Sequence, residues 1–429
     1  MQLKFYGVYV CFGLSISWAS ADDNVFDFDA PTKAHYALAD GVWFGSEVSG
    51  NMQYVDNLNL DDAEDDHLWI LEPEVSLVFS YAPHENFGAY IELEITDRSA
   101  ISRGQQNNDA TQTRLRLRQA YIAFPKVFKH VSLAIGRQRY KDVRAWWYDE
   151  RIDAARLVWS ADAWSVALSS AVDKVRGDDL LHKGGSKNNH FKILNVRYQA
   201  RKHLEHNFYL IKKNDHEKRD KENPLFFGVQ SAGRVTPDLH YWLNAAAVRG
   251  TAKGTRIEAY GLDLGFGYRF NLPTKPFLMV GVAYGSGDDQ ANDRRDRNFR
   301  QTGLEDNDGR LFGYNTYNYY GEVIDVGLSN LWITTLGVGF TPTKNTSIEW
   351  VYHTYQQVHR QDELFDSDLD QDPNGQDRDI GQALDLVMAY RASKQLNFGL
   401  ILGVFKPGQG FDGNPGNAYI GKFESSYRF

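Results

Sequence analysis

Three arginines at alternate positions are the residues of this sequence best suited to bind a charged ligand. Arg114, Arg116 and Arg118 alternate with leucines. Because successive side chains of a β-strand point to opposite faces, a strand here would place all three guanidinium groups on one face. Guanidinium groups bind carboxylates and phosphates through paired hydrogen bonds, so this face could contact an anionic substrate.

The segments expected just before these arginines carry carboxylates that could pair with them. Glu92 and Glu94 alternate with apolar residues, and Glu72 and Glu74 do so one segment earlier. Like charges that share one strand face repel each other unless partners neutralise them. Two interpretations follow. The carboxylates neutralise the arginines, which then only stabilise the sheet, or some of the arginines contact a carboxylate or phosphate of a transported molecule.

Other segments alternate in the same way, with an apolar face opposite a face of glycine and charge. Segments 256–270, 382–391 and 396–405 show the pattern, and Asp385 lies on the polar face of the second. This arrangement is inverted relative to a soluble sheet, so the apolar face must meet lipid and the polar face water. A closed barrel achieves this without leaving backbone groups unsatisfied in hydrocarbon. Asp385 is therefore expected to line the lumen.

Composition and chain ends favour an exported all-β protein. Aromatic residues make up 14% of the 429 residues, Met is only 4, and beyond the N-terminus no apolar run has the length of a spanning helix. Residues 1–21 have the positive start, apolar stretch and Ala19-Ser20-Ala21 ending of a signal peptide. This leaves 22–429 as the predicted barrel, and its last strand alternates up to Phe429, which resembles the assembly signal of outer-membrane barrels. A net charge of -9 argues against a nucleic-acid binder.

Connection lengths predict the number of strands. Short turns alternate with mostly longer, more polar loops, and eight turns with nine loops imply eighteen antiparallel strands with both chain ends on the periplasmic side. A barrel of this size can hold an aqueous lumen, which the long 287–330 loop could enter and constrict. The expected turns are 83–87, 125–130, 161–163, 202–205, 233–238, 271–275, 342–345 and 393–395. The expected loops are 58–65, 100–110, 141–151, 174–189, 214–223, 251–255, 287–330, 360–381 and 406–417.

Several blocks in conserved order resemble the alginate-export outer-membrane porins. They are Gly136-Arg137-Gln138-Arg139, Trp146-Trp147, Ile152-Asp153-Ala154, Gln301-Thr302-Gly303-Leu304-Glu305, Gly321-Glu322, Leu328-Ser329-Asn330-Leu331, Asp379-Ile380-Gly381-Gln382 and Phe405-Lys406-Pro407-Gly408. The resemblance implies an eighteen-stranded monomeric barrel with an arginine-rich, anion-selective constriction, through which polyuronate leaves the periplasm.

The same resemblance suggests which residues line the pore. Arg118, Arg137 and Arg139 stand where the family has basic residues, so they are expected to be pore arginines. The family also has basic residues in the long loop and on the penultimate strand, where this chain reads 315–320 and 399–401 without any. Tyrosine and asparagine in the first stretch would suit less charged sugars, or would pack the loop into the barrel mouth.

Metal binding and catalysis have weaker signals. Acidic runs at 61–66 and 362–379 could hold Ca²⁺ or bridge to lipopolysaccharide, although such runs usually face water. The second run matches only half of an EF-hand loop, because Gly381 stands where that loop needs glutamate. No nucleophilic serine stands out near His353 in sequence, and there is no metalloprotease, cysteine-pair or phosphate-loop motif. We expect no enzyme, metal or cofactor.

The sequence thus predicts an outer-membrane porin of a Gram-negative bacterium that passes an anionic polysaccharide by facilitated diffusion, in the direction of export. A general or nutrient porin for small anions or oligosaccharides is the alternative. The expected partners are the polysaccharide, outer-membrane lipid and lipopolysaccharide, and a periplasmic export scaffold. The predicted pore-lining residues are Arg118, Arg137, Arg139, Arg114, Arg116, Glu92, Glu94 and Asp385.

Overall fold

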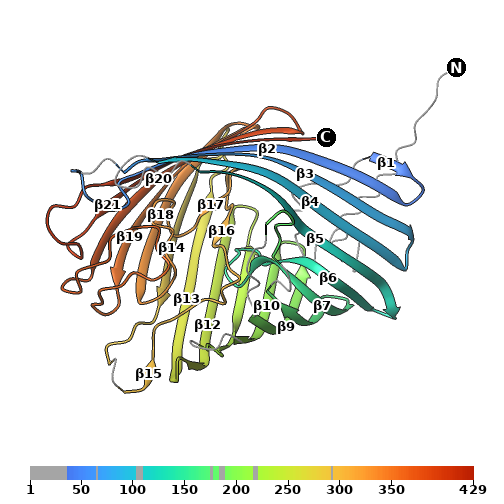
Figure 1. Ribbon diagram of the computed structural model, residues 1–429, viewed down its shortest axis with the longest axis horizontal. Helices are drawn as coiled ribbons and strands as arrows, with labels where there is room; N and C mark the ends of the chain where they lie inside the picture. The colour runs from blue at the N-terminus through green and yellow to red at the C-terminus, as the bar shows by residue number, and fades with distance from the viewer. Residues whose placement is uncertain are drawn as a thin grey trace.

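The computed structural model describes residues 36–63, 66–102, 110–173, 177–182, 189–215, 221–290 and 293–429, which form one closed β-barrel (Figure 1). The predicted signal peptide lies outside these residues. The eighteen barrel strands are β2 (Val42–Asp56), β3 (Leu68–His84), β4 (Phe87–Ser102), β5 (Ala110–Phe128), β6 (Val131–Lys141), β7 (Asp149–Ala161), β8 (Trp164–Val172), β9 (Asn189–Arg201), β10 (Leu204–Asp215), β11 (Leu225–Arg234), β12 (Leu239–Ala252), β13 (Thr255–Arg269), β14 (Phe277–Gly285), β18 (Leu331–Thr343), β19 (Thr346–Gln357), β20 (Asp379–Arg391), β21 (Leu396–Pro407) and β22 (Ala418–Arg428).

The barrel closes between its first and last strands. Each strand pairs antiparallel with the next, and β22 returns to β2 in a register that runs from Glu47 opposite Arg428 to Asp56 opposite Tyr419. Figure 1 shows the C-terminus beside β2 accordingly. Closure leaves no strand edge with unpaired backbone groups, as a barrel in lipid requires. The predicted count of eighteen strands is confirmed.

Four further strands are short and are not among the eighteen that form the barrel wall. They are β1 (Tyr36–Ala39), β15 (Arg295–Asp296), β16 (Asp308–Gly309) and β17 (Tyr317–Asn318). We call the barrel end with the eight short connections the turn end, and the other the loop end. β2 begins and β22 finishes at the turn end. Each predicted turn and loop spans a junction between consecutive barrel strands, although several overlap the strand ends, as 125–130 does with β5. The described residues contain no helix long and apolar enough to span a bilayer.

The two faces of the wall differ as the alternation predicted. Along β19, Trp350 and Tyr352 are exposed on the outside, whereas Glu349 and His353 are buried inside. Aromatic side chains near the turn end, such as Trp164 and Tyr198 with ring centroids 4.6 Å apart, are exposed on the outer face. Aromatic rings at this level are typical of the interfacial girdle of membrane barrels.

Residues 299–330 of the long connection between β14 and β18 fold into the barrel and fill part of it. Phe312 of this segment packs against the inner face of β13 at Gly267, where an added Cβ would lie 2.3 Å from the phenyl ring. Its Phe299 stacks on Trp146 of the β6–β7 loop, with ring centroids 5.9 Å apart. Glycine on the inner face therefore makes room for the aromatic side chains of the inserted segment. The lumen is narrowed by this segment, as the sequence suggested.

Candidate functional site

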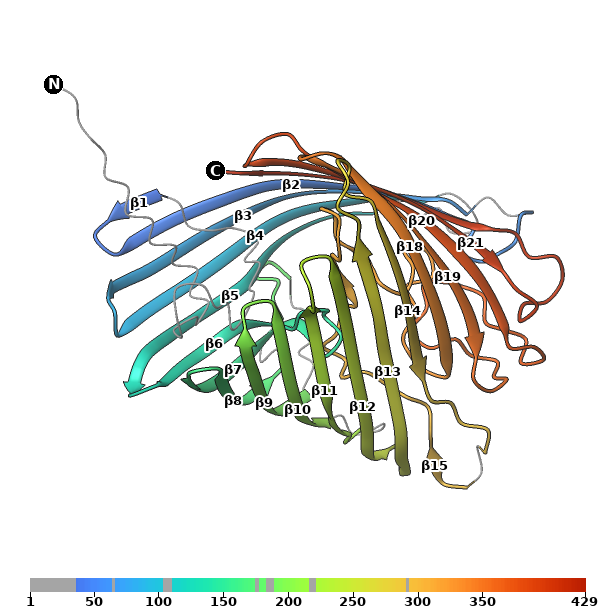
Figure 2. The same ribbon diagram turned by 180° about the vertical axis from the view of Figure 1, so that it is seen from behind.

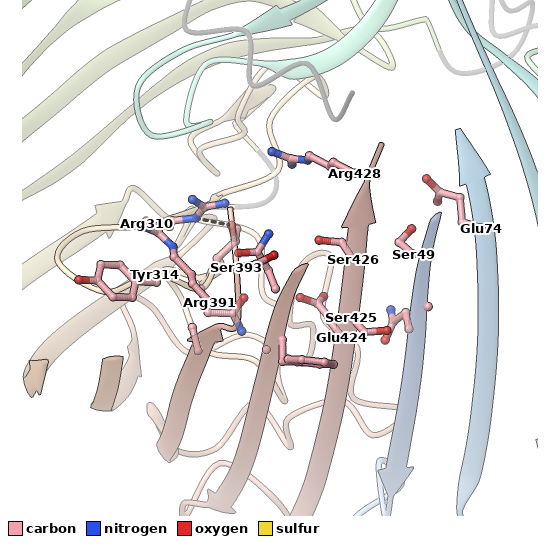
Figure 3. A pocket seen from close by; sticks show the side chains of 18 of the residues that line it. Ser49, Glu74, Arg310, Tyr314, Arg391, Ser393, Glu424, Ser425, Ser426 and Arg428 are labelled. Atoms are coloured by element: carbon pink, nitrogen blue, oxygen red, sulfur yellow. Dashed lines mark hydrogen bonds between the residues drawn. The ribbon is translucent and has the colours of Figure 1, made fainter. Parts of the chain in front are cut away.

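A cavity of about 970 Å³ lies in the lumen on the turn side of the inserted segment. Strands β2–β5 form one wall, and residues 310–316 with β20–β22 form the other (Figure 3). The polar lining favours an anion, because basic side chains outnumber acidic ones. Seven are basic, namely Arg116, Arg118, Arg310, Lys344, Arg391, Lys394 and Arg428, and four are acidic, namely Glu72, Glu74, Glu94 and Glu424.

Two arginines on the inserted-segment side are held without carboxylate partners. Arg310 donates from Nε to Thr316 Oγ1 at 3.3 Å, and the Arg391 guanidinium lies 4.0 Å from the centre of the Tyr314 ring. Neither forms an ion pair within the part of the chain that the structure describes. Figure 3 shows Arg310, Arg391 and Tyr314 close together at the cavity. These two cations are available to an anionic ligand, because no described carboxylate lies within ion-pairing distance of either guanidinium group.

Tyr314 fixes this side of the cavity to the wall. Its backbone N–H donates to Ser347 Oγ at 2.9 Å, and its hydroxyl donates to the carbonyl of Lys344 at 3.2 Å. Both acceptors belong to the region where β18 turns into β19. The inserted segment is thereby anchored at the point where Arg310 enters the cavity.

On the opposite wall, one carboxylate serves two arginines. Arg116 Nη1 and Arg118 Nε each lie 3.1 Å from a different oxygen of Glu94. Both arginine side chains stay about one-fifth exposed, whereas Glu94 is buried. One negative charge is thus divided between two positive ones, and Glu74 of the same wall lies close enough to interact with Arg118 and Glu94. Arg116 and Arg118 therefore link β5 to β4 through Glu94 and also line the cavity.

Arg137 and Arg139 lie in a different environment. Arg137 binds both carboxylate oxygens of Asp153, at 2.9 and 3.0 Å, and donates to the carbonyl of Leu117. Arg139 binds both oxygens of Asp149 at 2.7 and 2.9 Å, and Lys141 also contacts Asp149. Neither arginine lines the cavity. In this geometry they tie β6 to the start of β7.

The remaining predicted residues also lie away from the cavity. Arg114 donates to Gln112 of its own strand, and the fully buried Glu92 accepts a 2.6 Å hydrogen bond from Gln119. Asp385 is buried beneath the inserted segment, where it accepts a hydrogen bond from the backbone N–H of Glu322 at 3.3 Å. The structure therefore brings together Arg116, Arg118 and Glu94 from the predicted set.

Some of the cavity cations that were not predicted could have been found from the sequence, and others could not. Arg391 and Arg428 lie on polar faces of strands whose alternation was recognised, so their inward orientation could have been used. Arg310 had no such signal, because the path of the inserted segment has no period. The two stretches without basic residues do meet, since an added Cβ at Gly399 would lie 2.7 Å from the Asn315 amide. Arg310 and Arg391 supply positive charge next to this contact.

Comparison with known proteins identifies the family. The family model described as alginate export matches residues 43–419, which is most of the chain. The chain belongs to the alginate-export family. A curated relative, the alginate production protein AlgE of Pseudomonas aeruginosa, is 25% identical over 296 residues, covering 60% of this chain and 59% of that protein. The chain thus spans less than two thirds of the length of this relative.

Solved structures support the same fold for this alginate-export family member. OccK7 (OpdD) of Pseudomonas aeruginosa aligns with a TM-score of 0.59 at 14% identity, over 90% of this chain and 98% of that one. OccAB3 of Acinetobacter baumannii aligns with a TM-score of 0.57 at 11% identity, over 90% and 99%. At these identities the likeness concerns the fold alone. Family and fold together make the protein a porin of the Gram-negative outer membrane.

Among the described residues, His353 is the buried histidine on the inner face of this alginate-export barrel. His353 Nδ1 lies 3.0 Å from Thr335 Oγ1, and its Nε2 lies 3.8 Å from Asp385. The side chain is fully buried, so a substrate in the cavity cannot reach it. Across the described ranges, no group of three histidine, cysteine, aspartate or glutamate side chains is arranged to hold a metal ion. Family and fold point to a transporter rather than an enzyme.

An acidic cluster lies where the inserted segment of this alginate-export barrel meets the wall. Asp325 accepts a 2.5 Å hydrogen bond from Asn318, and Glu322 pairs with Lys422 of β22 at 2.6 Å. Burial, reinforced by the nearby Asp368 carboxylate, raises the pKa of Asp325 to about 7. Burial also raises the pKa of Asp308. These two buried carboxyl groups therefore bind a proton more readily than solvent-exposed ones do.

Proposed function

We propose that the protein passes an anionic polysaccharide, such as alginate or a similar polyuronate, across the outer membrane by facilitated diffusion, in the direction of export. The observation that carries this proposal is the cationic cavity, with Arg310 and Arg391 unpaired by any described carboxylate and facing Arg116 and Arg118. Membership of the family described as alginate export supports the class of cargo.

The arrangement suits a charged chain that must keep moving. A sugar carboxylate can accept two hydrogen bonds from one guanidinium group. Several cations on both sides of the cavity offer successive sites, and conduction requires that binding at each be weak enough to release the cargo. Asn397, Ser425 and Ser426 also line the cavity and can hydrogen-bond to sugar hydroxyls. Arg137 and Arg139 would act indirectly, by positioning the wall that carries Arg118.

The position of the cavity suits a cargo that arrives from the periplasm. Lys344, Asn345, Ser393 and Lys394 of two short turns line it, so it lies near the turn end. Short turns of bacterial outer-membrane barrels face the periplasm. A polymer leaving the periplasm would meet the cationic cavity first and the acidic loops last. A periplasmic scaffold that delivers the polymer would dock beside these turns.

Single-channel recording tests the proposal. The refolded barrel in a planar bilayer should give an anion-selective current that an oligouronate blocks and a neutral oligosaccharide of equal length does not. Arg118→Ala should weaken the block, whereas the control Arg256→Gln, on the outer face beside Glu258, should not. Equal block by both sugars, or by neither, would refute a polyuronate pore and favour a general porin.

A further inference from the structure

An apolar groove of about 460 Å³ lies on the outer face of the barrel, across the neighbouring strands β6–β11 that Figure 2 shows side by side. The groove is deepest at Ala155 and Ser170, because their side chains are smaller than the neighbouring ones that line it. Leucines of adjacent strands form its sides in one registered row, which contains Leu133, Leu157, Leu168, Leu194 and Leu210. The groove has the width of several strands and an apolar lining, which suits hydrocarbon chains.

Two lysines stand at the rim of this groove on the side of the loop end. Lys192 of β9 and Lys212 of β10 are directly opposite each other in the register, and both line the groove. Lys192 donates to Ser170 Oγ at 2.5 Å, and Lys212 donates to the carbonyl of Asn223 at 2.6 Å. Neither forms an ion pair with any carboxylate in the described ranges. Like charges directly opposite on a sheet destabilise it, so a shared anion would be stabilising here.

A third cation continues the row. Leu225 of β11 is opposite Lys212 on one side and opposite Arg249 of β12 on the other. Arg249 is exposed, and its Nη1 donates to the carbonyl of Val248 at 3.0 Å. The outer wall therefore carries a short cationic band directly above the leucine row.

The cationic band lies at the level along the barrel where lipid headgroups of the outer leaflet are expected. Lys192 is three residues from the loop end of β9, which corresponds to about 10 Å along the strand. Loops of outer-membrane barrels face the outside of the cell, so the lysines lie toward the outer leaflet. Long cationic side chains at such a position extend their charges to the membrane interface.

We propose that this groove binds the lipid A part of lipopolysaccharide, with a phosphate between Lys192 and Lys212 and acyl chains along the leucine row. The charge complementarity is direct, because two neighbouring ammonium groups share one phosphate. The site needs no bridging divalent cation, in contrast to one built from the acidic loops. It lies outside the lumen and is independent of what the pore transports.

Native mass spectrometry of the full barrel in detergent tests the site. The probes are bisphosphorylated lipid A, its dephosphorylated form and phosphatidylglycerol. The wild type should retain bisphosphorylated lipid A about ten-fold more strongly than either other lipid, since a phosphate monoester carries more negative charge than the phosphodiester of phosphatidylglycerol, and dephosphorylated lipid A has no phosphate. The double variant Lys192→Gln with Lys212→Gln should lose this preference. The control pair Lys129→Gln with Lys275→Gln, which removes two charges at turns of the other barrel end, should keep it.

The experiment distinguishes a wrong lipid site from a misfolded variant, and its result does not depend on the transport proposal. Unchanged lipid A binding by the groove variant, with the same preference for phosphate, would overturn the site. If that variant does not fold, the three-lipid comparison on the wild type still decides, because equal retention of all three lipids contradicts the proposal. A lipid-free dimer would indicate instead that the groove is covered by a second copy. Single-channel currents should be the same with and without lipid A, whichever cargo the pore carries.

Discussion

The barrel uses arginine in two opposite ways on its inner surface. Arg137 and Arg139 each have a carboxylate in a two-point contact and are mostly buried between β6 and β7. Arg310 donates to a hydroxyl and Arg391 lies over an aromatic ring, and neither forms an ion pair with a carboxylate in the described ranges. An arginine that is ion-paired to a carboxylate links two strands of the wall. An arginine without such a partner is solvated, and an anion that passes through the lumen can replace its water. The number of arginines inside a barrel therefore does not give its selectivity.

The largest effect is expected from neutralising the unpaired cations. Arg310→Gln combined with Arg391→Gln should weaken block by an oligouronate by about a hundred-fold, since each charge-assisted contact is worth about 1.4 kcal/mol or more. The concentration dependence of block in single-channel recordings measures this. Arg256→Gln provides the matched control. A change smaller than about three-fold would show that the unpaired cations do not bind the cargo.

A smaller effect is expected from displacing the inserted segment. Gly267→Ala would place a Cβ 2.3 Å from Phe312, so the aromatic ring and the neighbouring Arg310 must move. Single-channel conductance should rise about two-fold, because the segment narrows the lumen. Gly421→Ala is the control, since a Cβ there lies 3.6 Å from Leu402, an ordinary contact. Equal conductance of both variants would mean that Phe312 does not hold the constriction.

The paired arginines should affect stability instead of selectivity. Arg137→Gln would leave Asp153 without its two-point partner, and we expect about 2–3 kcal/mol lower stability, since Asp153 is partly exposed. Urea unfolding of the barrel in lipid vesicles gives this value. Reversal potentials in a salt gradient should be unchanged. A clear loss of anion selectivity without loss of stability would return Arg137 to the set of pore residues.

The smallest effect is expected from pH. Because the pKa of Asp325 is raised to about 7, the docked segment holds a proton that an undocked one releases above about pH 4. Docking is therefore strongest below about pH 4, weakens as pH rises from about 4 to about 7, and changes little above that. Current noise should grow by roughly two-fold between pH 5 and pH 8. Asp325→Asn should remove this increase, and a persistent increase would assign the dependence to other carboxylates.

Strand positions followed from the sequence because lipid imposes a period of two on every strand, and the strand count followed from the alternation of short turns with longer loops. The period of two also placed Arg116, Arg118 and Glu94 inside, where the structure has them. It could not assign partners, because Asp153 opposes Arg137 only once the β6–β7 register is known. Arg310 escaped prediction because the inserted segment follows the shape of the lumen instead of a repeating pattern.

The most direct test of the account reverses the charge of the unpaired pair. Arg310→Glu combined with Arg391→Glu replaces two positive charges by two negative ones, which takes the cavity lining from seven basic and four acidic side chains to five and six. The reversal potential in a potassium chloride gradient should change sign, from anion-selective to cation-selective. A folded variant that remains as anion-selective as the wild type would contradict the claim that these two cations control what passes.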